Sequence, residues 1–332
     1  MGARARARDA RRTTRAFVAI LALALRAATT PAAGTTLRWR KLHAWGENKL
    51  GEQGRGTATS AGTCAEGELP ELGWDLNETV SRVVAGLDHA VALTARGEAY
   101  AWGSNRCGQL GTGDFIDALT PQRILSSHTI VDVAVGVEHT LALASDGALL
   151  AFGCNTRGAL GIGSANLGRH ATPQTVTSAE TFTAIAAAGA HSVGLTEQGA
   201  VYTWGANNQG QLGLGGCVFP GGPGRDPCLN DVHTPTKVLV MNDGLVLPPI
   251  KLIAAGGGTL AGVARVPIGG HTVAVAKLDN SVYAWGDNFA GQLGVPQVYF
   301  NASSSAYFNN TPTYTPNKVR RIFLAQDAHL IN

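Results

Sequence analysis

Charge is scarce in this sequence: 15% of its 332 residues are Asp, Glu, Lys or Arg, against roughly a quarter in ordinary soluble domains. Hydrophobic residues make up 45%, which excludes an intrinsically disordered chain, because such chains combine high charge with few apolar residues. Only 14 residues are proline and glycine has no three-residue period, so a collagen helix is excluded. Glycine is too frequent, and Lys and Glu too few, for a coiled coil.

The motifs of common enzymes and metal sites are missing as well. The sequence has no Gly-x-x-x-x-Gly-Lys-Ser/Thr phosphate loop, and none of its five cysteines has zinc-site spacing. No Ser-His-Asp set or carboxylate pair can be nominated, because the candidate residues recur with an internal repeat. We therefore predict that the protein is not an enzyme and has no catalytic residue, metal or cofactor.

The N-terminal segment differs from the rest of the chain. Residues 1–34 hold seven arginines and one aspartate, and residues 17–25 form an uninterrupted apolar run. A basic segment, a short apolar run and small residues after it are typical of a secretory signal peptide. The run is too short to span a bilayer, which takes about 20 residues. We predict a leader at 1–34 and a propeller domain at 35–332, secreted or in the secretory pathway, with no membrane span once the leader is removed.

Other interpretations of this segment are a mitochondrial transit peptide, an uncleaved anchor and an artefact of the gene model, which would place the protein in an organelle, the cytoplasm or the nucleus. Without residues 1–34 the formal charge of +3 becomes negative. The rest of the chain then offers no positive excess to a phosphate backbone, so we expect no nucleic-acid partner.

Two further features fit a secreted glycoprotein. Asn77, Asn301 and Asn309 begin N-glycosylation sequons. Cys217 and Cys228 bracket a stretch rich in glycine and proline, which a disulfide between them would close. Because the cysteine count is odd, at least one thiol is left unpaired or bonds another chain.

Nineteen of the 43 glycines lie at fixed positions of an internal repeat, Trp-Gly-x-Asn-x-x-Gly-Gln-Leu-Gly and close variants, which occurs five times. A histidine element, which reads Gly-x-x-His before His89 and His139 and has glycine one or two residues before His191 and His271, precedes each of the last four copies together with a tight-turn dipeptide. The aromatic residues are Trp45, Trp102, Phe152, Trp204 and Trp285; the asparagines are Asn48, Asn105, Asn155, Asn207 and Asn288; the histidines are His89, His139, His191 and His271.

Each unit reads as a strand, a hairpin, a second strand and a glycine-rich loop. The strands alternate a large apolar residue with alanine, as in Val91-Ala92-Leu93, and neither side is polar. A sheet that is apolar on both faces is buried on both faces. Four-stranded sheets packed radially around an axis meet this condition, so we predict an all-β fold, a β-propeller. A linear solenoid is the alternative.

The pattern resembles the regulator of chromosome condensation family. The Gly-x-x-His strand, the Asp-Gly-like hairpin and the Trp-Gly-x-Asn loop carry the resemblance, from about residue 37 to 325. It implies a β-propeller of blades of about 50 residues, usually seven to a ring. Here residues 37–45 give the end of one unit, and residues 315–325 resemble the start of another. If these ends pair, they clasp a five-unit ring; otherwise the chain is an open arc or part of an incomplete seven-bladed propeller.

The repeated residues are expected to build the scaffold. An asparagine fixes a turn, an aromatic residue anchors blade packing, and a histidine that occurs once per blade cannot converge with its counterparts on one metal ion. Binding residues are expected where the repeat is interrupted, at 57–77, 215–232 and 256–270. Arg225, Asp226 and Arg265 are the candidate residues for binding at the rim loops.

The sequence thus predicts a non-enzymatic interaction module, exported, that binds a protein partner through rim loops. The resemblance implies the alternative, guanine-nucleotide exchange on the small GTPase Ran. The apolar run after the arginines and the acidic remainder of the chain argue against that alternative. A catalytic propeller is a third interpretation, which no residue at an interruption of the repeat supports.

Overall fold

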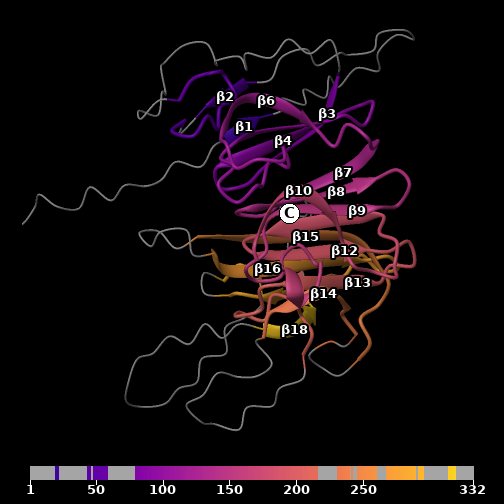
Figure 1. Ribbon diagram of the computed structural model, residues 1–332. Coiled ribbons are helices and arrows are strands. Elements are labelled where there is room, and N and C mark those ends of the chain that lie inside the picture. Colours follow the sequence, from indigo (N-terminus) through magenta and orange to yellow (C-terminus); the bar gives the residue numbers. More distant parts are fainter. Residues whose placement is uncertain are drawn as a thin grey trace, which may run out of the picture.

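The chain folds into four antiparallel sheets of four strands and one sheet of two strands (Figure 1). The computed structural model describes residues 19–21, 43–45, 48–58, 79–215, 230–239, 241, 245–259, 267–288, 291–294 and 313–318. The four-stranded sheets stand one beside the next as blades, so the predicted all-β propeller class is confirmed.

We number the blades in chain order, and in each blade the strands pair in the order in which they follow in the sequence. Blade I holds β3 (Val80–Ala85), β4 (His89–Thr94), β5 (Ala99–Gly103) and β6 (Ala118–Ile124). Blade II holds β7 (Ile130–Val135), β8 (His139–Ala144), β9 (Leu149–Cys154) and β10 (Arg169–Thr175), with the short 3-10 helix η1 (Ser164–Asn166) before β10. Blade III holds β11 (Ala184–Ala188), β12 (His191–Leu195), β13 (Val201–Gly205) and β14 (Val232–Lys237). Blade IV holds β15 (Ile250–Thr259), β16 (Pro267–Ala276), β17 (Val282–Gly286) and β18 (Thr313–Lys318).

The middle strands of the blades form the core. Every residue of β4, β8 and β12 is buried, as expected for strands with apolar or small residues on both sides. The first strands of neighbouring blades contact one another, β7 with β11 and β11 with β15. One apolar cluster fills each interface between neighbouring four-stranded blades, which we call a seam.

The fourth strand of each blade is its outer edge. It carries a Thr-Pro pair in every blade, and proline suits an edge strand because it has no N–H to donate to a further neighbour. The prediction that residues 315–325 start a new unit was wrong for residues 315–318, and its remaining residues, 319–325, lie outside the described part of the chain. Thr313–Lys318 is the outer strand of blade IV, paired with β17, and does not start a new unit.

The two ends of the blades carry different connections. At the hairpin rim, tight turns join the second and third strands, and Gly97, Gly147, Gly199 and Asn280 have φ between 58° and 89° in them. These are the predicted hairpins, and they are confirmed. At the opposite glycine-loop rim, the repeated Trp-Gly-x-Asn segments join the third and fourth strands.

Blade IV departs from the repeat. Its strands β15 and β16 have ten residues each, against five or six in the first and second strands of the other blades. They extend into the predicted insertion at 256–270, where Gly257 pairs with Gly270 and Thr259 with Pro267. The outer parts of that insertion are therefore a continued β-ladder rather than a loop.

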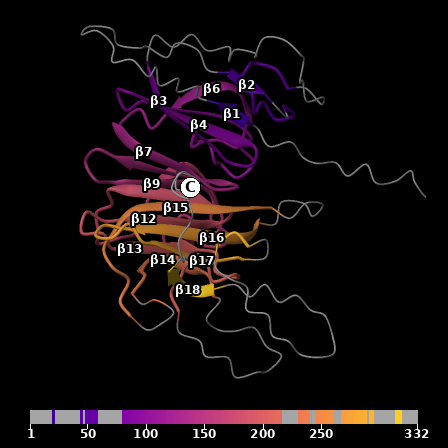
Figure 2. The same cartoon turned by 180° about the vertical axis from the view of Figure 1, so that it is seen from behind.

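The N-terminal unit is a short ribbon followed by a glycine loop. Strand β1 (Ala19–Leu21) pairs antiparallel with β2 (His43–Trp45), and the loop at 48–58 packs on blade I. Both views place β2 and β18 at opposite ends of the row of blades (Figures 1 and 2). The predicted clasp between the two chain ends is therefore absent from the described strands. In the described part of the chain, no helix is long and apolar enough to cross a bilayer.

Candidate interaction surface

One buried asparagine holds each glycine loop in shape. Its side-chain oxygen accepts the backbone N–H of the residue five positions later, and the asparagine is at most 4% exposed. The bonded pairs are Asn48–Gln53 (3.0 Å), Asn105–Leu110 (3.0 Å), Asn155–Leu160 (2.9 Å), Asn207–Leu212 (3.2 Å) and Asn288–Leu293 (3.1 Å). These oxygens are directed into the loops, where they replace a backbone acceptor, and not toward a ligand.

The repeated histidines link each blade to the next. His89 Nε2 lies 3.1 Å from the hydroxyl of Thr140, which itself donates to the Gln109 carbonyl at 2.7 Å. The same chain recurs from His139 to Ser192 and the Ala159 carbonyl (3.0 and 2.8 Å), and from His191 to Thr272 and the Gln211 carbonyl (3.3 and 2.9 Å). Because each hydroxyl uses its proton on a carbonyl, the histidine Nε2 must be the donor.

This arrangement keeps the histidines neutral. Burial lowers the pKa of His89 to about 4, and burial together with the neighbouring histidines lowers the pKa of His139 and of His191 to about 3. In His89, Nδ1 is buried without a hydrogen-bond partner, so a second ring proton would have no acceptor. The residue after His139, His191 and His271 supplies the seam hydroxyl (Thr140, Ser192 and Thr272), a role that we did not assign from the sequence although the repeat displays it.

The repeated aromatic residues close the same seams. The Trp102 indole N–H donates to the Glu52 carbonyl, and that of Trp204 to the Ala159 carbonyl, each at 2.9 Å. The next ring packs on the last glycine of the preceding loop: a Cβ at Gly213 would lie 2.5 Å from the Trp285 indole nitrogen, and its φ is +66°. Glycine is required there both for space and for backbone conformation.

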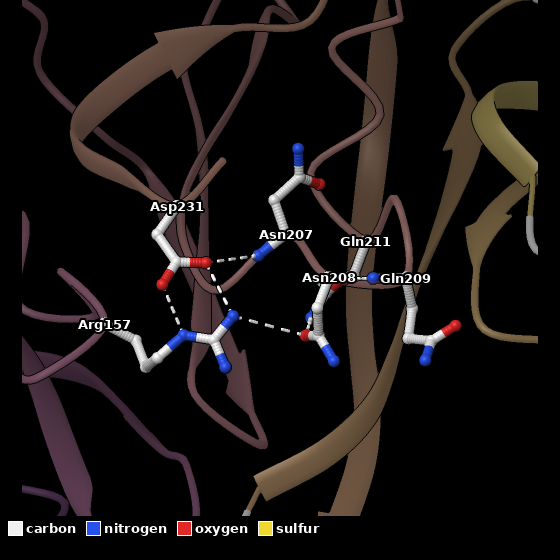
Figure 3. A network of polar contacts seen from close by, with 6 residues as sticks. All are labelled: Arg157, Asn207, Asn208, Gln209, Gln211 and Asp231. Carbon is white, nitrogen blue, oxygen red and sulfur yellow. Dashed lines mark hydrogen bonds and ion pairs between the residues drawn. The ribbon is translucent and has the colours of Figure 1, made fainter. Parts of the chain in front are cut away.

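The residue two positions after the loop asparagine reaches the next blade, and its chemistry differs between seams. In blade I it is Cys107, which forms a disulfide with Cys154 of blade II. In blade II it is Arg157, which pairs with Asp231 just before β14 and contacts Asn208 (Figure 3). Asp231 also accepts the backbone N–H of Asn207 at 3.1 Å, so the pair holds the glycine loop of blade III against the start of β14.

One group of residues has metal-ligand atoms close together. The sulfurs of Cys107 and Cys154 and a carboxylate oxygen of Glu138 lie within 4.8 Å of one another. The two sulfurs are bonded to each other, however, and a disulfide offers no thiolate to a metal. The predicted pairing of Cys217 with Cys228 lies outside the described residues, and the sequence did not lead us to the Cys107–Cys154 pair.

An exposed apolar group marks the glycine-loop rim of blade I. Phe115 is 45% exposed and Ile116 71%, both in the β5–β6 loop, and Leu119 follows at 36% on β6. The Arg169 guanidinium from β10 lies over the Phe115 ring, 4.8 Å from its centroid. We call these four residues the loop patch. Such side chains in a loop on a rigid scaffold are the kind of surface that proteins use for binding.

A pocket of about 470 Å³ adjoins the loop patch, between residues 112–119 and the β6 residues Gln122 and Arg123. Asp114 lies at its edge, where hydrogen bonds from the Thr112 hydroxyl and the Ile116 N–H lower the pKa of the carboxyl group. The pocket is thus lined mainly by polar and charged side chains, including an ionised carboxylate, with Ile116 and Leu119 as its large apolar residues. The sequence analysis did not single out this loop, because its residues lie inside a regular repeat.

The binding and modification residues predicted from the sequence lie elsewhere. Arg225, Asp226, Arg265, Asn77, Asn301 and Asn309 are all outside the described residues. The residues predicted to build the repeat lie within them: Trp102, Phe152, Trp204 and Trp285 are fully buried, the asparagines are buried inside their own glycine loops, and the first three histidines bond across the seams.

Comparison with known proteins agrees with this architecture. The sequence model of the RCC1-like domain matches residues 35–329. The chain is 31% identical to human probable E3 ubiquitin-protein ligase HERC6 over 257 residues (75% of this chain, 22% of HERC6), and 31% identical to the Arabidopsis thaliana ultraviolet-B receptor UVR8 over 258 residues (77% of this chain, 51% of UVR8). It therefore spans about half or less of these relatives.

Solved structures show the same fold. Human WBSCR16 superposes with a TM-score of 0.65 at 21% identity, covering 85% of this chain and 63% of that one. Yeast RCC1 (Prp20), in its complex with Kap60, superposes with a TM-score of 0.62 at 22% identity, covering 85% and 57%. RCC1-like propellers are a protein-interaction fold. With the family match over most of its length, this chain belongs to the RCC1-like domain family.

Proposed function

We propose that this chain is an exported, non-enzymatic interaction module that binds a protein partner through its glycine-loop rim. The observation that carries the proposal is the loop patch, in which Phe115 and Ile116 are exposed on a loop whose base is braced by Asn105. A rigid loop loses little conformational freedom on binding, so its apolar side chains contribute most of their burial to affinity. Arg169 and Asp114 place both charges beside the patch, which favours a partner with an apolar centre and a polar rim.

Two features support export. The Cys107–Cys154 disulfide joins neighbouring blades, and such bonds persist in oxidising compartments. The basic N-terminal segment with its short apolar run supports entry into the secretory pathway. Cleavage after about residue 34 would remove β1 and leave β2 at the start of the mature chain.

Expression in a secretory host tests export directly. The full chain should enter the medium with an N-terminus near residue 35, a mass shift that a glycosidase removes, and the Cys107–Cys154 bond detectable by peptide mapping. A chain that begins at residue 35 should stay inside the cell. A nuclear location for the intact chain, or secreted material that keeps residues 1–34, would contradict the proposal.

A paired capture experiment tests the rim. The secreted protein is used as bait for proteins from the extracellular fluid of its source, alongside Ile116→Glu and Leu278→Glu. Leu278 is 87% exposed at the hairpin rim and serves as the matched control. A specific partner should be lost with Ile116→Glu and kept with Leu278→Glu. Equal capture by the three proteins would show that the loop patch does not bind it.

The alternative is guanine-nucleotide exchange on a Ran-type GTPase, which the structural similarity to yeast RCC1 suggests. At 22% identity that likeness shows the fold alone. The discriminating measurement is the release of a fluorescent guanine nucleotide from Ran. Release accelerated by the purified chain would favour the alternative over the proposed function.

A further inference from the structure

Blade IV ends the row of blades with a face that differs from those of the other three. In β4, β8 and β12 the second and fourth positions after the histidine are at most 4% exposed, because the next blade covers them. The residues are Val91, Leu93, Leu141, Leu143, Val193 and Leu195. In β16 the equivalent Val273 and Val275 are half-buried, and the residues between them are fully buried. This alternation shows a sheet covered on one face only.

The neighbouring strand continues the same apolar face. Leu252 and Ala254 of β15 pair with Val275 and Val273 and are exposed, Leu252 by 59%. His271, at the histidine position, is half-buried, whereas the other three histidines are at most 3% exposed. Together Leu252, Ala254, His271, Val273 and Val275 form what we call the terminal face.

The glycine loop of blade IV also lacks a neighbouring strand among the described residues. The first glycine after the loop asparagine packs on the outer strand of the next blade: Gly51 on Leu119, Gly108 on Ala171 and Gly158 on His233, each with a nearest approach of 2.3–2.6 Å for a Cβ built there. A Cβ on the equivalent Gly291 would have no atom within 4 Å. In the described part of the chain, nothing therefore stands where a fifth blade would follow.

The three closed seams define what this face accepts. An occupant must bring apolar side chains on the face of a strand and an aromatic residue that can pack on the last glycine of the loop, as Trp285 does on Gly213. The other end of the same chain has this composition. Ala19 pairs with Trp45 and Ile20 with Ala44 in the register in which Ala90 pairs with Trp102 and Val91 with Ala101. Strand His43–Trp45 is thus the third strand of a blade unit that no described blade precedes.

We propose that the terminal face of one copy docks on strand β2 and the glycine loop after it (residues 43–45 and 48–58) of a second copy, head to tail, in the manner of the internal seams. These residues remain in the chain when residues 1–34 are removed. The two surfaces lie at opposite ends of the row of blades, so one copy does not join them in the described fold (Figures 1 and 2). Because the N-terminal unit offers fewer strands than a whole blade, the contact is weaker than an internal seam and reversible. A head-to-tail contact between copies produces rings or open chains.

Sedimentation velocity of the full chain across a wide range of concentrations tests the proposal. The wild type should form species larger than a monomer as concentration rises. Leu252→Glu should weaken association at least about tenfold, the factor that corresponds to 1.4 kcal/mol. Leu252 is already exposed, so the variant should keep its fold, as unchanged circular dichroism and thermal midpoint would show. Leu278→Glu, in the same blade but off the terminal face, is the matched control.

A second variant identifies the surface of the other copy that the terminal face contacts. Trp45→Ala should weaken association as Leu252→Glu does, and a mixture of the two variants should associate less than the wild type. A chain that stays monomeric throughout overturns the proposal. So does a Leu252→Glu variant that associates like the wild type. Association that is lost in Leu252→Glu but intact in Trp45→Ala overturns the head-to-tail arrangement in favour of two terminal faces packed together.

Discussion

The seam between blades I and II and the seam between blades II and III are built from one repeat and locked by different chemistry. Both contain a histidine, a hydroxyl and a loop carbonyl in a hydrogen-bonded chain. The first adds the Cys107–Cys154 disulfide and packs Phe152, whereas the second adds the Arg157–Asp231 pair and the Trp204 indole N–H. The comparison separates residues that make a blade from residues that lock two blades together.

Acid should break all the histidine seams together, with the largest effect. The pKa of His89, His139 and His191 is about 6.5 in the unfolded chain and about 3 to 4 in the fold, so the unfolded chain binds more protons in between. Stability is therefore complete above about pH 6.5 and falls as the pH drops toward 4, by about 1.4 kcal/mol per pH unit for each histidine. Urea unfolding at a series of pH values measures the slope.

His139→Gln sharpens that test, because it removes one titrating group from the second seam. Its unfolding should depend less steeply on pH than that of the wild type. A wild-type protein of constant stability from pH 7 to 4.5 would show that the histidines do not stay neutral in the fold.

Removing the anchor of the second seam should have the next largest effect. Trp204→Ala deletes a fully buried ring and leaves the Ala159 carbonyl with one donor fewer, at a cost of about 3–5 kcal/mol. Trp204→Phe should cost less, about 1–2 kcal/mol, because Phe152 fills the equivalent place in the first seam without an N–H. Denaturant unfolding compares the two variants, and an equal loss in both would assign the role to the hydrogen bond rather than to packing.

Breaking the covalent lock should cost less than losing the ring. The Cys107–Cys154 bond closes a segment of 47 residues, so replacing both cysteines with serine should lower stability by about 2–4 kcal/mol. A reductant should lower the thermal midpoint of the wild type and leave that of the double variant unchanged. If the reductant shifts both midpoints equally, another bond is responsible.

The ionic lock of the second seam should contribute least. Arg157 and Asp231 are 30% and 22% exposed, so Arg157→Met should cost about 1 kcal/mol or less, and less still in high salt. A double-mutant cycle with Asp231→Asn isolates the pair from the bond that Asp231 makes to the Asn207 N–H. A coupling energy as large as the disulfide's contribution would remove the difference between the two seams.

The fold could be predicted from the sequence because the same pattern of turn residues and apolar strands occurs in each unit. Glycine and asparagine at fixed offsets predicted the turns, and strands apolar on both sides predicted sheets buried on both faces. The outer strands were harder to place. Thr-Pro-Asn-Lys at 315–318 carries no apolar alternation, so its role as the last strand of blade IV came only from its pairing with β17.

The candidate binding surface and the contacts between blades could be predicted from the sequence less completely than the fold. Contacts between blades depend on which side chains meet across a seam, and Cys107 and Cys154 lie 47 residues apart in different repeats. The residue after each histidine did carry a readable signal: Thr140, Ser192 and Thr272 have hydroxyl groups, whereas Ala90 does not. In the N-terminal unit, Ala19 pairs with Trp45 as Ala90 pairs with Trp102, and the residue before Ala19 in the sequence is valine, so the unit before Ala90 has no histidine to bond.

The direction of the histidine chain has an evolutionary consequence. Blades II, III and IV each give a hydroxyl to the blade before them, and blades I, II and III each receive one from the blade after them. In blades II and III both halves of the contact therefore lie within one unit and within one stretch of DNA. Tandem duplication of a whole unit therefore inserts a matched donor and acceptor at once, and every junction stays satisfied whatever the number of copies. A duplication that begins between the histidine and the glycine loop of the same unit also keeps one hydroxyl for each histidine. The loss of one hydroxyl, in contrast, leaves the histidine of the preceding blade without its hydrogen-bond acceptor.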